Sequence, residues 1–449
     1  MNVIGLDIGT TTICGIAVDA ENGRLLKSVT LPNDSFIDGK PFEKIQSPEK
    51  IIEKVTALAE NLFNEFSPVC AVGITGQMHG IVYLNSEGKA VSPLYTWQDG
   101  SGNEKLDDSN YAKNLSEITG YAAASGFGGT TYYYHSKNNL VPENAVIFCT
   151  IHDYAAMVLT GRIKPLMHSS DAASFGLFDL KKGCFDKKAI EKAGLDYSYF
   201  PEVTDKYEAV GEYKGVPVCC AIGDNQASFI GSVRDIRESG LINIGTGAQM
   251  SCAVPAFPEG TDLDVRPLTD KNYIIAGSAL CGGRAYAMLE RLFRRVAEEV
   301  TGNNIASAYK MMDRLMDGIE VKSPITVDTR FGGTRADPSI RGSITGIGTD
   351  NFDIETLCDG FMTGMATELY GLYDEMKPCL CAEMSHMIAS GNGVRFNSSL
   401  KKRLERVFGV EILIPAHKEE GCFGALLYAL TASGVYDTLT EAQKLIKYE

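Results

Sequence analysis

The sequence predicts an α/β protein of two domains with a similar plan, and three observations lead to this fold class. The chain has 449 residues, which suggests about two to three domains of roughly 150 residues each. The segments 3–18 and 241–254 both read as a β-rich run, a Gly/Thr turn and a second β-rich run. Helical and strand patterns alternate along the rest of the chain, which is typical of sheets covered by helices.

The two hairpin-like segments are the main evidence for two domains. The first reads VIGLDIGTTTICGIAV and the second reads LINIGTGAQMSCAV, and each pattern predicts two strands joined by a tight turn. One Gly-Thr turn after a strand is common, but a matched pair favours two domains that each place a turn at one face of a sheet. We place the boundary within 231–240, which gives an N-terminal domain 1–233 and a C-terminal domain 234–449.

The segments between the hairpins supply the helices and one further strand. The segment 48–66 begins with Pro48 and repeats apolar residues at helical spacing, so it predicts a helix. The apolar run 69–74 follows it as a buried strand. Two further amphipathic helices are predicted over 286–300 and 353–376.

Composition and charge exclude several classes of protein. With 42 basic and 57 acidic residues, the net charge is −15, so binding to nucleic acid, which relies on Lys and Arg, is not expected. No apolar run approaches the roughly 18 residues of a membrane-spanning helix, and no signal peptide is visible. Twelve cysteines without a CxxC pair indicate a reducing compartment. We therefore expect a cytoplasmic protein without a membrane partner.

The turn of each hairpin is a candidate phosphate-binding site. Glycine lets a ligand approach the backbone closely, and turn N–H groups with hydroxyls can surround phosphate oxygens. The residues concerned are Thr10, Thr11 and Thr12 in the first turn and Gly245, Thr246 and Gly247 in the second. Asp7 ends the preceding strand and could hold Mg²⁺ directly or through water. Together the turns suggest a triphosphate held between two domains, although either turn alone fits a plain hairpin.

Asp224 is a candidate general base. It follows a buried strand and Gly223, directly before the second half of the chain. A carboxylate at this position could accept the proton of an attacking hydroxyl and orient it towards phosphorus. The alternative is that Asp224 caps a helix, a position at which Asp is common. The two roles are compatible, and the residues alone leave both open.

Three further segments carry groups suited to a small ligand. The segments 75–80, TGQMHG, and 95–99, YTWQD, combine amides, imidazole and carboxylate with Trp97, the only Trp of the chain. A polyol needs polar groups for its hydroxyls and a flat ring for its C–H faces, and Trp97 lies in a polar run, so we interpret it as part of a binding surface. The segment 390–397, SGNGVRFN, could border a flat ring such as adenine, but it also fits an ordinary strand–helix turn.

Taken in order, the segments DIGTTT, TGQMHG, GDNQA, INIGTGA and SGNGVRFN resemble the FGGY carbohydrate kinases over essentially the whole chain. The resemblance implies a two-domain actin-like ATPase fold (ribonuclease H-like), with mixed sheets flanked by helices and an interdomain cleft. Met78-His79 and Asp224-Asn225 are similar to the xylulokinase-type members. Longer phrases such as GGTTYYYH are more similar to the sedoheptulokinase branch, while Ser101 stands where related chains often have Arg.

The resemblance also implies roles for individual residues. Asp224 would be the general base for the terminal primary hydroxyl of the sugar, and Mg²⁺ would lie near Asp7 and Asp224. The ATP phosphates would bind the two turns, residues 10–12 and 245–247. The residues implied to line the sugar pocket are Gln77, Met78, His79, Trp97, Asp224 and Asn225. Those implied to border the nucleoside are Gly391, Asn392 and Asn397.

These observations favour an ATP-dependent kinase that converts a ketose, first of all sedoheptulose, to its terminal phosphate, sedoheptulose 7-phosphate. A xylulokinase or another ketose or polyol kinase is the alternative within the family. A non-metabolic actin-like ATPase module is the alternative from another class. The two phosphate sites fit that module equally well, but it needs no polyol pocket. The expected ligands are ATP, Mg²⁺ and a small sugar, and a homodimer is an assembly that the resemblance allows.

Overall fold

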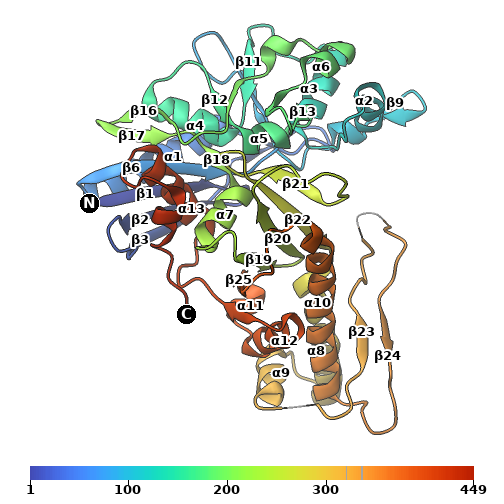
Figure 1. The fold of residues 1–449 in the computed structure, drawn as a ribbon. Coiled ribbons are helices and arrows are strands. Elements are labelled where there is room, and N and C mark those ends of the chain that lie inside the picture. The colour runs from blue at the N-terminus through green and yellow to red at the C-terminus, as the bar shows by residue number, and fades with distance from the viewer. Residues whose placement is uncertain (320, 335–336) are drawn as a thin grey trace.

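The computed structural model describes residues 1–319, 321–334 and 337–449 and shows two lobes, each built around a mixed β-sheet (Figure 1). The strands of the N-terminal lobe lie in the order β16-β17-β6-β1-β2-β3, and β18 also pairs with β6. Their bounds are β1 Asn2–Ile8, β2 Thr12–Asp19, β3 Leu25–Pro32, β6 Val69–Gly76, β16 Ala209–Tyr213, β17 Val216–Cys219 and β18 Ile222–Gly223.

The register of this sheet brings three strand ends together. β1 and β2 form the first predicted hairpin, and β1 pairs with β6 in parallel, with Ile8 opposite Gly76. β18 also runs parallel to β6, with Gly223 opposite Gly76. The carboxyl ends of these strands therefore meet at one edge, which is where ligands bind in open α/β sheets.

The C-terminal lobe repeats this plan around the second predicted hairpin. Its strands lie in the order β21-β22-β20-β19-β25-β26. Their bounds are β19 Ser239–Ile244, β20 Ala248–Val254, β21 Asp264–Pro267, β22 Tyr273–Ala279, β25 His386–Ser390 and β26 Glu411–Leu413. β19 and β25 are parallel, with Asn243 opposite Ser390, so the turns that begin at Gly245 and Gly391 share one sheet edge.

Two helices cover opposite faces of the N-terminal sheet. α1 (Pro48–Glu65) packs Leu58 and Leu62 against Gly15 of β2. α13 (Glu420–Ala432) lies on the other face: a Cβ at Gly5 would lie 2.3 Å from the carbonyl oxygen of Cys422. The glycine lets the helix backbone lie directly on the sheet. The last helices of the chain therefore return to the first lobe, and Figure 1 shows α13 beside β1 and β6.

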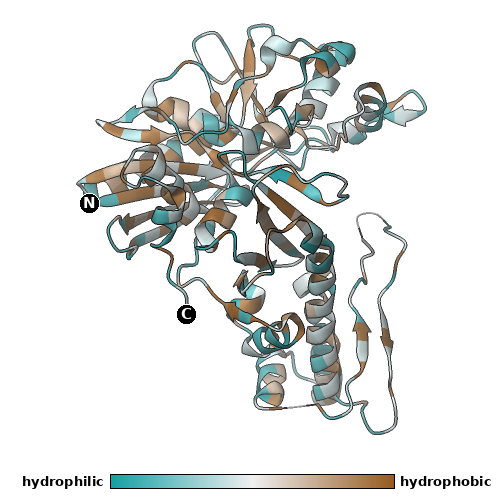
Figure 2. Ribbon diagram, in the orientation of Figure 1, coloured by the Kyte–Doolittle hydropathy of each residue, from teal (hydrophilic) through white to brown (hydrophobic). Residues whose placement is uncertain are grey.

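The helices of the C-terminal lobe pack around α10 (Ile354–Met376), which contacts β20 and β22. The others near it are α8 Gly282–Thr301, α9 Tyr309–Met316, α11 Asn392–Arg395 and α12 Ser398–Phe408, with the hairpin β23 Thr326–Asp328 and β24 Ser343–Thr345. Figure 2 shows hydrophobic colouring along the central strands of the two sheets and a mixture of both colours along the overlapping helices α8 and α10. This distribution is expected of buried sheets covered by amphipathic helices.

Most of the remaining elements form an aromatic-rich cap on the N-terminal lobe, with Tyr83, Phe148 and Phe175 at its centre. A short helix lies near the C-terminus. Among the cap helices, α4 (Ile151–Thr160) and α5 (Ser169–Ser174) approach the sheet. The other helices are α2 Tyr111–Thr119, α3 Gly128–Lys137, α6 Lys187–Lys192, α7 Asp224–Ser232 on the sheet edge, and α14 Leu439–Gln443. The short strands are β4 Phe36–Ile37, β5 Ile45–Gln46, β7 Val82–Leu84, β8 Leu94–Tyr95, β9 Lys105–Leu106, β10 Ser109–Asn110, β11 Ile147–Cys149, β12 Leu166–His168, β13 Phe178–Asp179, β14 Cys184–Phe185 and β15 Glu202–Thr204.

The predicted elements are confirmed with small changes at their ends. Helix α1 stops one residue before the predicted end, α8 begins four residues before the predicted start, and Asp353 is the N-cap of α10. Among the helices that the structure describes, none is long and apolar enough to cross a bilayer. The division at residues 233 and 234 stays a prediction, since α13 packs on the sheet of the other lobe.

Candidate active site

Asp7 and Asp224 lie at the meeting point of the strand ends in the N-terminal lobe. Asp7 is the last but one residue of β1, and Asp224 begins α7 immediately after β18. The N-cap of α7 is Gly223, and no side chain caps this helix. The interpretation of Asp224 as an N-cap is therefore wrong, and its carboxylate is free to face the cleft.

The two carboxylates share a cavity of about 620 Å³ with the second Gly/Thr turn. The N-terminal lobe contributes Asp7, Asp224 and Asn225 to its lining, and the C-terminal lobe contributes Asn243 and the turn 245–247. The cavity thus lies between residues of both lobes. A phosphate chain held by the turn would lie in the same cavity as the two carboxylates.

The environment of the carboxylates disfavours their charge. Burial raises the pKa of Asp7 to about 6. Burial, and then repulsion by Asp7, raises the pKa of Asp224 to about 7. A divalent cation between them would remove this penalty, so their raised pKa values fit a site for Mg²⁺. Within the described part of the chain no cluster of three or more His, Cys, Asp or Glu side chains could hold a metal, and two carboxylates with phosphates and waters are the usual protein share of a Mg²⁺ site.

A buried ion pair lies behind this edge. The Nε2 atom of His152 is 3.0 Å from Oδ1 of Asp171, and both side chains are fully buried. Burial alone would lower the pKa of His152, but Asp171 raises it to about 9, so the imidazole is charged. The neighbouring Ser170 hydroxyl accepts a hydrogen bond of 3.0 Å from the backbone N–H of Gly223. Ser170 thus supports the residue before Asp224. The His152 imidazolium lowers the pKa of both cleft carboxyls, while Asp171 raises that of Asp224.

The second turn is held against the N-terminus of α8. The backbone N–H of Gly283 donates to the carbonyl of Gly245 at 3.0 Å, and that of Arg284 donates to Thr246 at 3.0 Å. A Cβ at Gly282 would lie 2.4 Å from the carbonyl carbon of Gly247, so only glycine allows this contact. Sequence reasoning missed Gly282 and Gly283, although a Gly-Gly pair two residues after an apolar run and before a helical pattern could have marked them.

A larger cavity, of about 1030 Å³, extends from the second Gly/Thr turn into the C-terminal lobe. The two cavities share Gly245 and Thr246, and the predicted nucleoside residues Gly391, Asn392 and Asn397 line the larger one. Gly391 has φ +87°, and a Cβ there would lie 2.6 Å from the carbonyl oxygen of Ile244. The structure therefore brings the predicted phosphate and nucleoside residues of this lobe into one continuous space.

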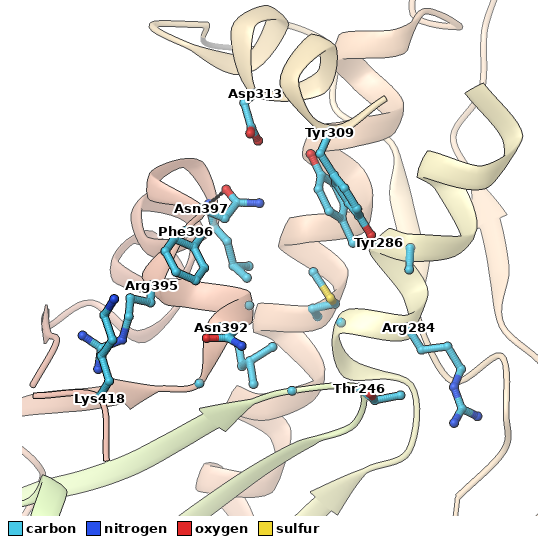
Figure 3. A pocket seen from close by; sticks show the side chains of 18 of the residues that line it. Thr246, Arg284, Tyr286, Tyr309, Asp313, Asn392, Arg395, Phe396, Asn397 and Lys418 are labelled. Carbon is cyan, nitrogen blue, oxygen red and sulfur yellow. Dashed lines mark hydrogen bonds between the residues drawn. The ribbon is translucent and has the colours of Figure 1, made fainter. Parts of the chain in front are cut away.

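The larger cavity also has an aromatic wall that the sequence did not reveal. The rings of Tyr286 on α8 and Tyr309 on α9 stack with centroids 6.2 Å apart, and Figure 3 shows them opposite Phe396 and Asn397. Arg284, Asp313 and Lys418 complete the polar rim. Flat aromatic faces with a few polar groups suit a purine base.

The residues predicted for the sugar lie beside the first turn. The Thr10 hydroxyl donates to Oε1 of Gln77 at 3.0 Å and accepts from Nε1 of Trp97 at 2.9 Å. Gln77 is buried and also donates to Gln46, whereas Trp97 is 48% exposed. Thr11 and Thr12 are exposed. None of the three threonines lines the cavity that holds Asp7 and Asp224, so their predicted contact with phosphate stays a prediction.

Met78 and His79 flank the same edge. A Cβ at Gly223 would lie 2.7 Å from Met78, so this side chain packs directly beside the residue that precedes Asp224. His79 has φ +71°, its Nδ1 lies 2.7 Å from the carbonyl oxygen of Ser174, and its ring stacks on Phe127 with centroids 4.7 Å apart. A non-glycine residue in this region of φ indicates a backbone held in place by its surroundings.

Comparison with known proteins identifies the family. Residues 2–231 match the model of the N-terminal domain of the FGGY family of carbohydrate kinases. A sedoheptulokinase of Mus musculus is 25% identical, with 95% of this chain and 97% of that protein covered. A xylulose kinase of Lactococcus lactis subsp. lactis is 22% identical, with 98% and 90% covered. The crystal structure of xylulose kinase from Rhodospirillum rubrum has a TM-score of 0.83 at 19% identity, with 100% of this chain and 93% of that one covered.

The structural likeness confirms the predicted actin-like ATPase fold of mixed sheets flanked by helices. The family match covers just over half of the chain, and it makes the protein a sugar kinase that uses ATP. This sets aside the alternative of a non-metabolic ATPase module. The chain belongs to the FGGY family of carbohydrate kinases.

Proposed function

We propose that this chain transfers the γ-phosphate of ATP to the terminal primary hydroxyl of a ketose, and that the ketose is sedoheptulose. One observation carries the proposal: Asp224 and the Gly/Thr turn 245–247 line the same cavity. The sedoheptulokinase relative, which aligns over nearly the whole of both chains, supports the choice of sugar. Xylulose or another ketose or polyol is the second candidate, supported by the xylulose kinase relative.

In this proposal Asp224 accepts the proton of the sugar hydroxyl as that oxygen approaches phosphorus. A base must be ionised to act, and burial raises the pKa of Asp224 to about 7, so part of the population would be protonated at neutral pH. The charged imidazole of His152 favours the ionised form and its partner Asp171 opposes it, while the hydrogen bond from Gly223 to Ser170 holds the start of α7 in place. Only a small decrease in the pKa of Asp224 would then be needed for most of the population to be ionised near neutral pH.

Mg²⁺ would be held by Asp7 and Asp224, directly or through water, and when bound it would neutralise the phosphate charge that develops during transfer. The backbone and hydroxyl of the turn 245–247 would orient the phosphates, with Thr10, Thr11 and Thr12 as the second group of phosphate ligands. Gly391, Asn392 and Asn397 would border the nucleoside, beside the rings of Tyr286 and Tyr309. Closure of the two lobes would exclude water from the γ-phosphate.

The sugar would bind on the N-terminal side of the cleft. Trp97 offers an exposed ring, anchored by its bond to Thr10, for the C–H face of a sugar. Gln77, Met78, His79 and Asn225 would surround its hydroxyls. Gln77 bonds to Thr10 and Gln46 in this structure, so we assign it to the support of the first turn as well.

A substrate panel tests this proposal. ADP release is measured with Mg²⁺-ATP and, in turn, sedoheptulose, xylulose, ribulose, gluconate and glycerol. We expect the highest kcat/KM for sedoheptulose. A tenfold or greater preference for another sugar would overturn the choice of ketose, and turnover of none of them would overturn the proposal as a whole.

The base is tested by Asp224→Asn. We expect kcat to fall by about 10²–10⁴-fold, the usual contribution of a positioned base, while ATP still binds. An unchanged kcat would exclude Asp224 as the base. Asp38→Asn, at an exposed carboxyl that lines neither of the two cavities, is the matched control and should leave kcat unchanged.

Two further features are part of this proposal. All twelve cysteines are free thiols, and most are buried, which supports a reducing compartment such as the cytoplasm.

We also retain 1–233 and 234–449 as the kinase domains. Limited proteolysis with and without ATP would test that division, since the 231–240 segment should be cleaved first if it joins two units.

A further inference from the structure

A third cavity, of about 490 Å³, is lined by residues of both lobes and shares none of them with the two cavities described above. Its N-terminal wall comes from the hairpin β13–β14, the start of α5 and Asp205. Its C-terminal wall comes from the segment 255–257 and the turn between β21 and β22. The Tyr273 hydroxyl joins the two walls by donating to the carbonyl of Leu180 at 2.9 Å. The volume is that of a site for a small ligand.

The cavity is positively charged. The lysines that line it are Lys181, Lys182 and Lys271. The first two pair with Glu259 and Asp179, but neither of these acids lines the cavity. Lys271 has no salt-bridge partner among the described residues. Because a hollow lined by one sign of charge concentrates ions of the other sign, this cavity favours an anion.

The backbone at Lys271 indicates that its side chain is present for a reason other than the turn. Asp270 and Lys271 have φ +50° and +59°, in the region that favours glycine. Consecutive residues of this kind are most readily Asn-Gly or Asp-Gly, so glycine would suit position 271 better than lysine. We interpret Lys271 as a residue whose charge is used.

The N-terminal wall offers groups that suit sugar hydroxyls. Ser169 is 3% exposed, and among the described residues its hydroxyl has no hydrogen-bond partner. A buried hydroxyl without a partner destabilises the folded state, and a ligand hydroxyl would supply the missing bond. The carboxylate of Asp205 can accept a second ligand hydroxyl, and the rings of Phe178 and Phe257 provide apolar surface for C–H groups.

We propose that this cavity is a second ligand site, which binds a phosphorylated sugar. The phosphate lies at Lys271 and Lys181, and the sugar hydroxyls lie at Ser169 and Asp205. An amine for the phosphate, acceptors for hydroxyls and an apolar wall are together the groups that this class of ligand requires. The site is separate from the cavities of the proposed reaction, so binding there does not depend on which sugar the enzyme phosphorylates.

Both walls of the cavity are joined to α7, the helix of the proposed base. Ser170 follows a lining residue of the N-terminal wall, and its hydroxyl accepts from the N–H of Gly223. Gln226 of α7 donates to the carbonyl of Pro267 at 2.9 Å, and Pro267 lines the C-terminal wall. The walls meet where α5 contacts β21 (Figure 1). A ligand bound to both walls would hold the lobes together here and oppose the closure that turnover needs, an effect that rests on the proposed function.

Isothermal titration calorimetry without ATP tests the site, with fructose 6-phosphate as the probe. We expect it to bind about tenfold more tightly than inorganic phosphate or fructose, because only the phosphorylated sugar contacts both groups of residues. Lys271→Asn should weaken binding about tenfold, the contribution of a hydrogen bond to a charged group. Lys105→Asn is the matched control, since Lys105 is exposed and lines none of the three cavities. Trp97→Ala should also leave binding unchanged, whereas binding at the proposed sugar site would be weakened.

Ser169→Ala separates recognition from folding. It should weaken binding about fivefold, the value of one neutral hydrogen bond, without lowering the melting temperature, because the hydroxyl has no partner in the protein. Lys271→Asn should not lower the melting temperature either, since Asn tolerates positive φ. No binding of fructose 6-phosphate, or binding that Lys271→Asn does not weaken, would overturn the proposal. Equal binding of inorganic phosphate would overturn the recognition of a sugar.

Steady-state kinetics test the link to α7. Saturating fructose 6-phosphate should lower kcat without raising the KM for either substrate, and Lys271→Asn should remove this effect. Binding that leaves kcat unchanged would overturn the link between the site and the base. If the enzyme phosphorylates none of the sugars offered, the calorimetric result still decides whether the site exists.

Discussion

We expect the substitution Asp224→Asn to stabilise the ligand-free protein and, at the same time, to abolish most of the turnover of the enzyme. The folded state holds Asp224 and Asp7 in one cleft, where burial and mutual repulsion raise the pKa of Asp224 to about 7. The unfolded chain releases the same proton near its ordinary pKa of about 4. Between these values the folded state binds the extra proton, so its stability falls as pH rises from about 4 to about 7. Asn keeps the shape and removes the charge.

The size of the effect follows from the pKa. A pKa raised by about three corresponds to about 4 kcal/mol of lost stability above pH 7, at about 1.4 kcal/mol for each tenfold change in proton binding. Water reaches this cleft and screens the charge, so we expect about half of that value, roughly 2 kcal/mol. For a chain of this length that corresponds to a rise of roughly 2 °C in melting temperature. Near pH 4 the variant should gain almost nothing, because Asp224 is then neutral when folded.

Differential scanning calorimetry in the presence of a chelator is the suitable assay, since the single Trp97 gives little fluorescence to follow. The variant and the unaltered protein are compared at pH 5 and pH 8, with Asp38→Asn as the control for the loss of an ordinary surface charge. An equal gain at both pH values, or no gain at pH 8, would refute the electrostatic reasoning. Added Mg²⁺ should stabilise the unaltered protein more than the variant, because it removes the same repulsion.

The other predictions concern the sugar, the nucleoside and the support of the base. Trp97→Ala should raise the KM for sugar more than the KM for ATP in steady-state assays, because its exposed ring lies beside the first turn. Tyr286→Ala should raise the KM for ATP about tenfold. This change corresponds to the lower end of the free energy of stacking between a base and an aromatic side chain. His152→Gln should lower the free energy of unfolding in urea by about 3–5 kcal/mol, because Asp171 is left as a buried unpaired charge, and adding Asp171→Asn should restore part of it. Gly424→Ala should lower kcat at least tenfold, since a small displacement of α7 would misplace the base.

Much of the fold was predictable because it depends on local patterns. The two hairpins, α1, β6, α8 and α10 follow from apolar spacing and turn residues, which act over a few positions. The positions of Asp7 and Asp224 at one edge also follow, once β1, β6 and β18 are known to be parallel. The sequence alone could name these carboxylates, but it could not show that they share one cavity.

The rest depends on contacts between distant segments. His152 and Asp171 stand on separate helices, and six scattered His residues give no signal by which one could be chosen. Tyr286 and Tyr309 are ordinary members of amphipathic helices until α8 and α9 are placed against α11. The threonines of the first turn were assigned to phosphate binding from their own Gly/Thr pattern. In the structure Thr10 also bonds to Gln77 and Trp97, contacts across more than sixty residues that a local pattern does not show.

Helix α7, which carries the proposed base Asp224, is positioned by the last part of the chain, so the two predicted domains do not pack independently of each other. A Cβ at Gly424 of α13 would lie 1.7 Å from the carbonyl oxygen of Ala227, and one at Gly231 of α7 would lie 2.2 Å from that of Glu420. The two helices therefore meet backbone to backbone, which fixes α7 more closely than side-chain contact would. A fragment that ends at residue 233 would lack α13 and would expose the face of the sheet around Gly5. The N-terminal lobe, and with it the position of Asp224, is therefore complete only when residues 420–432 have folded onto it.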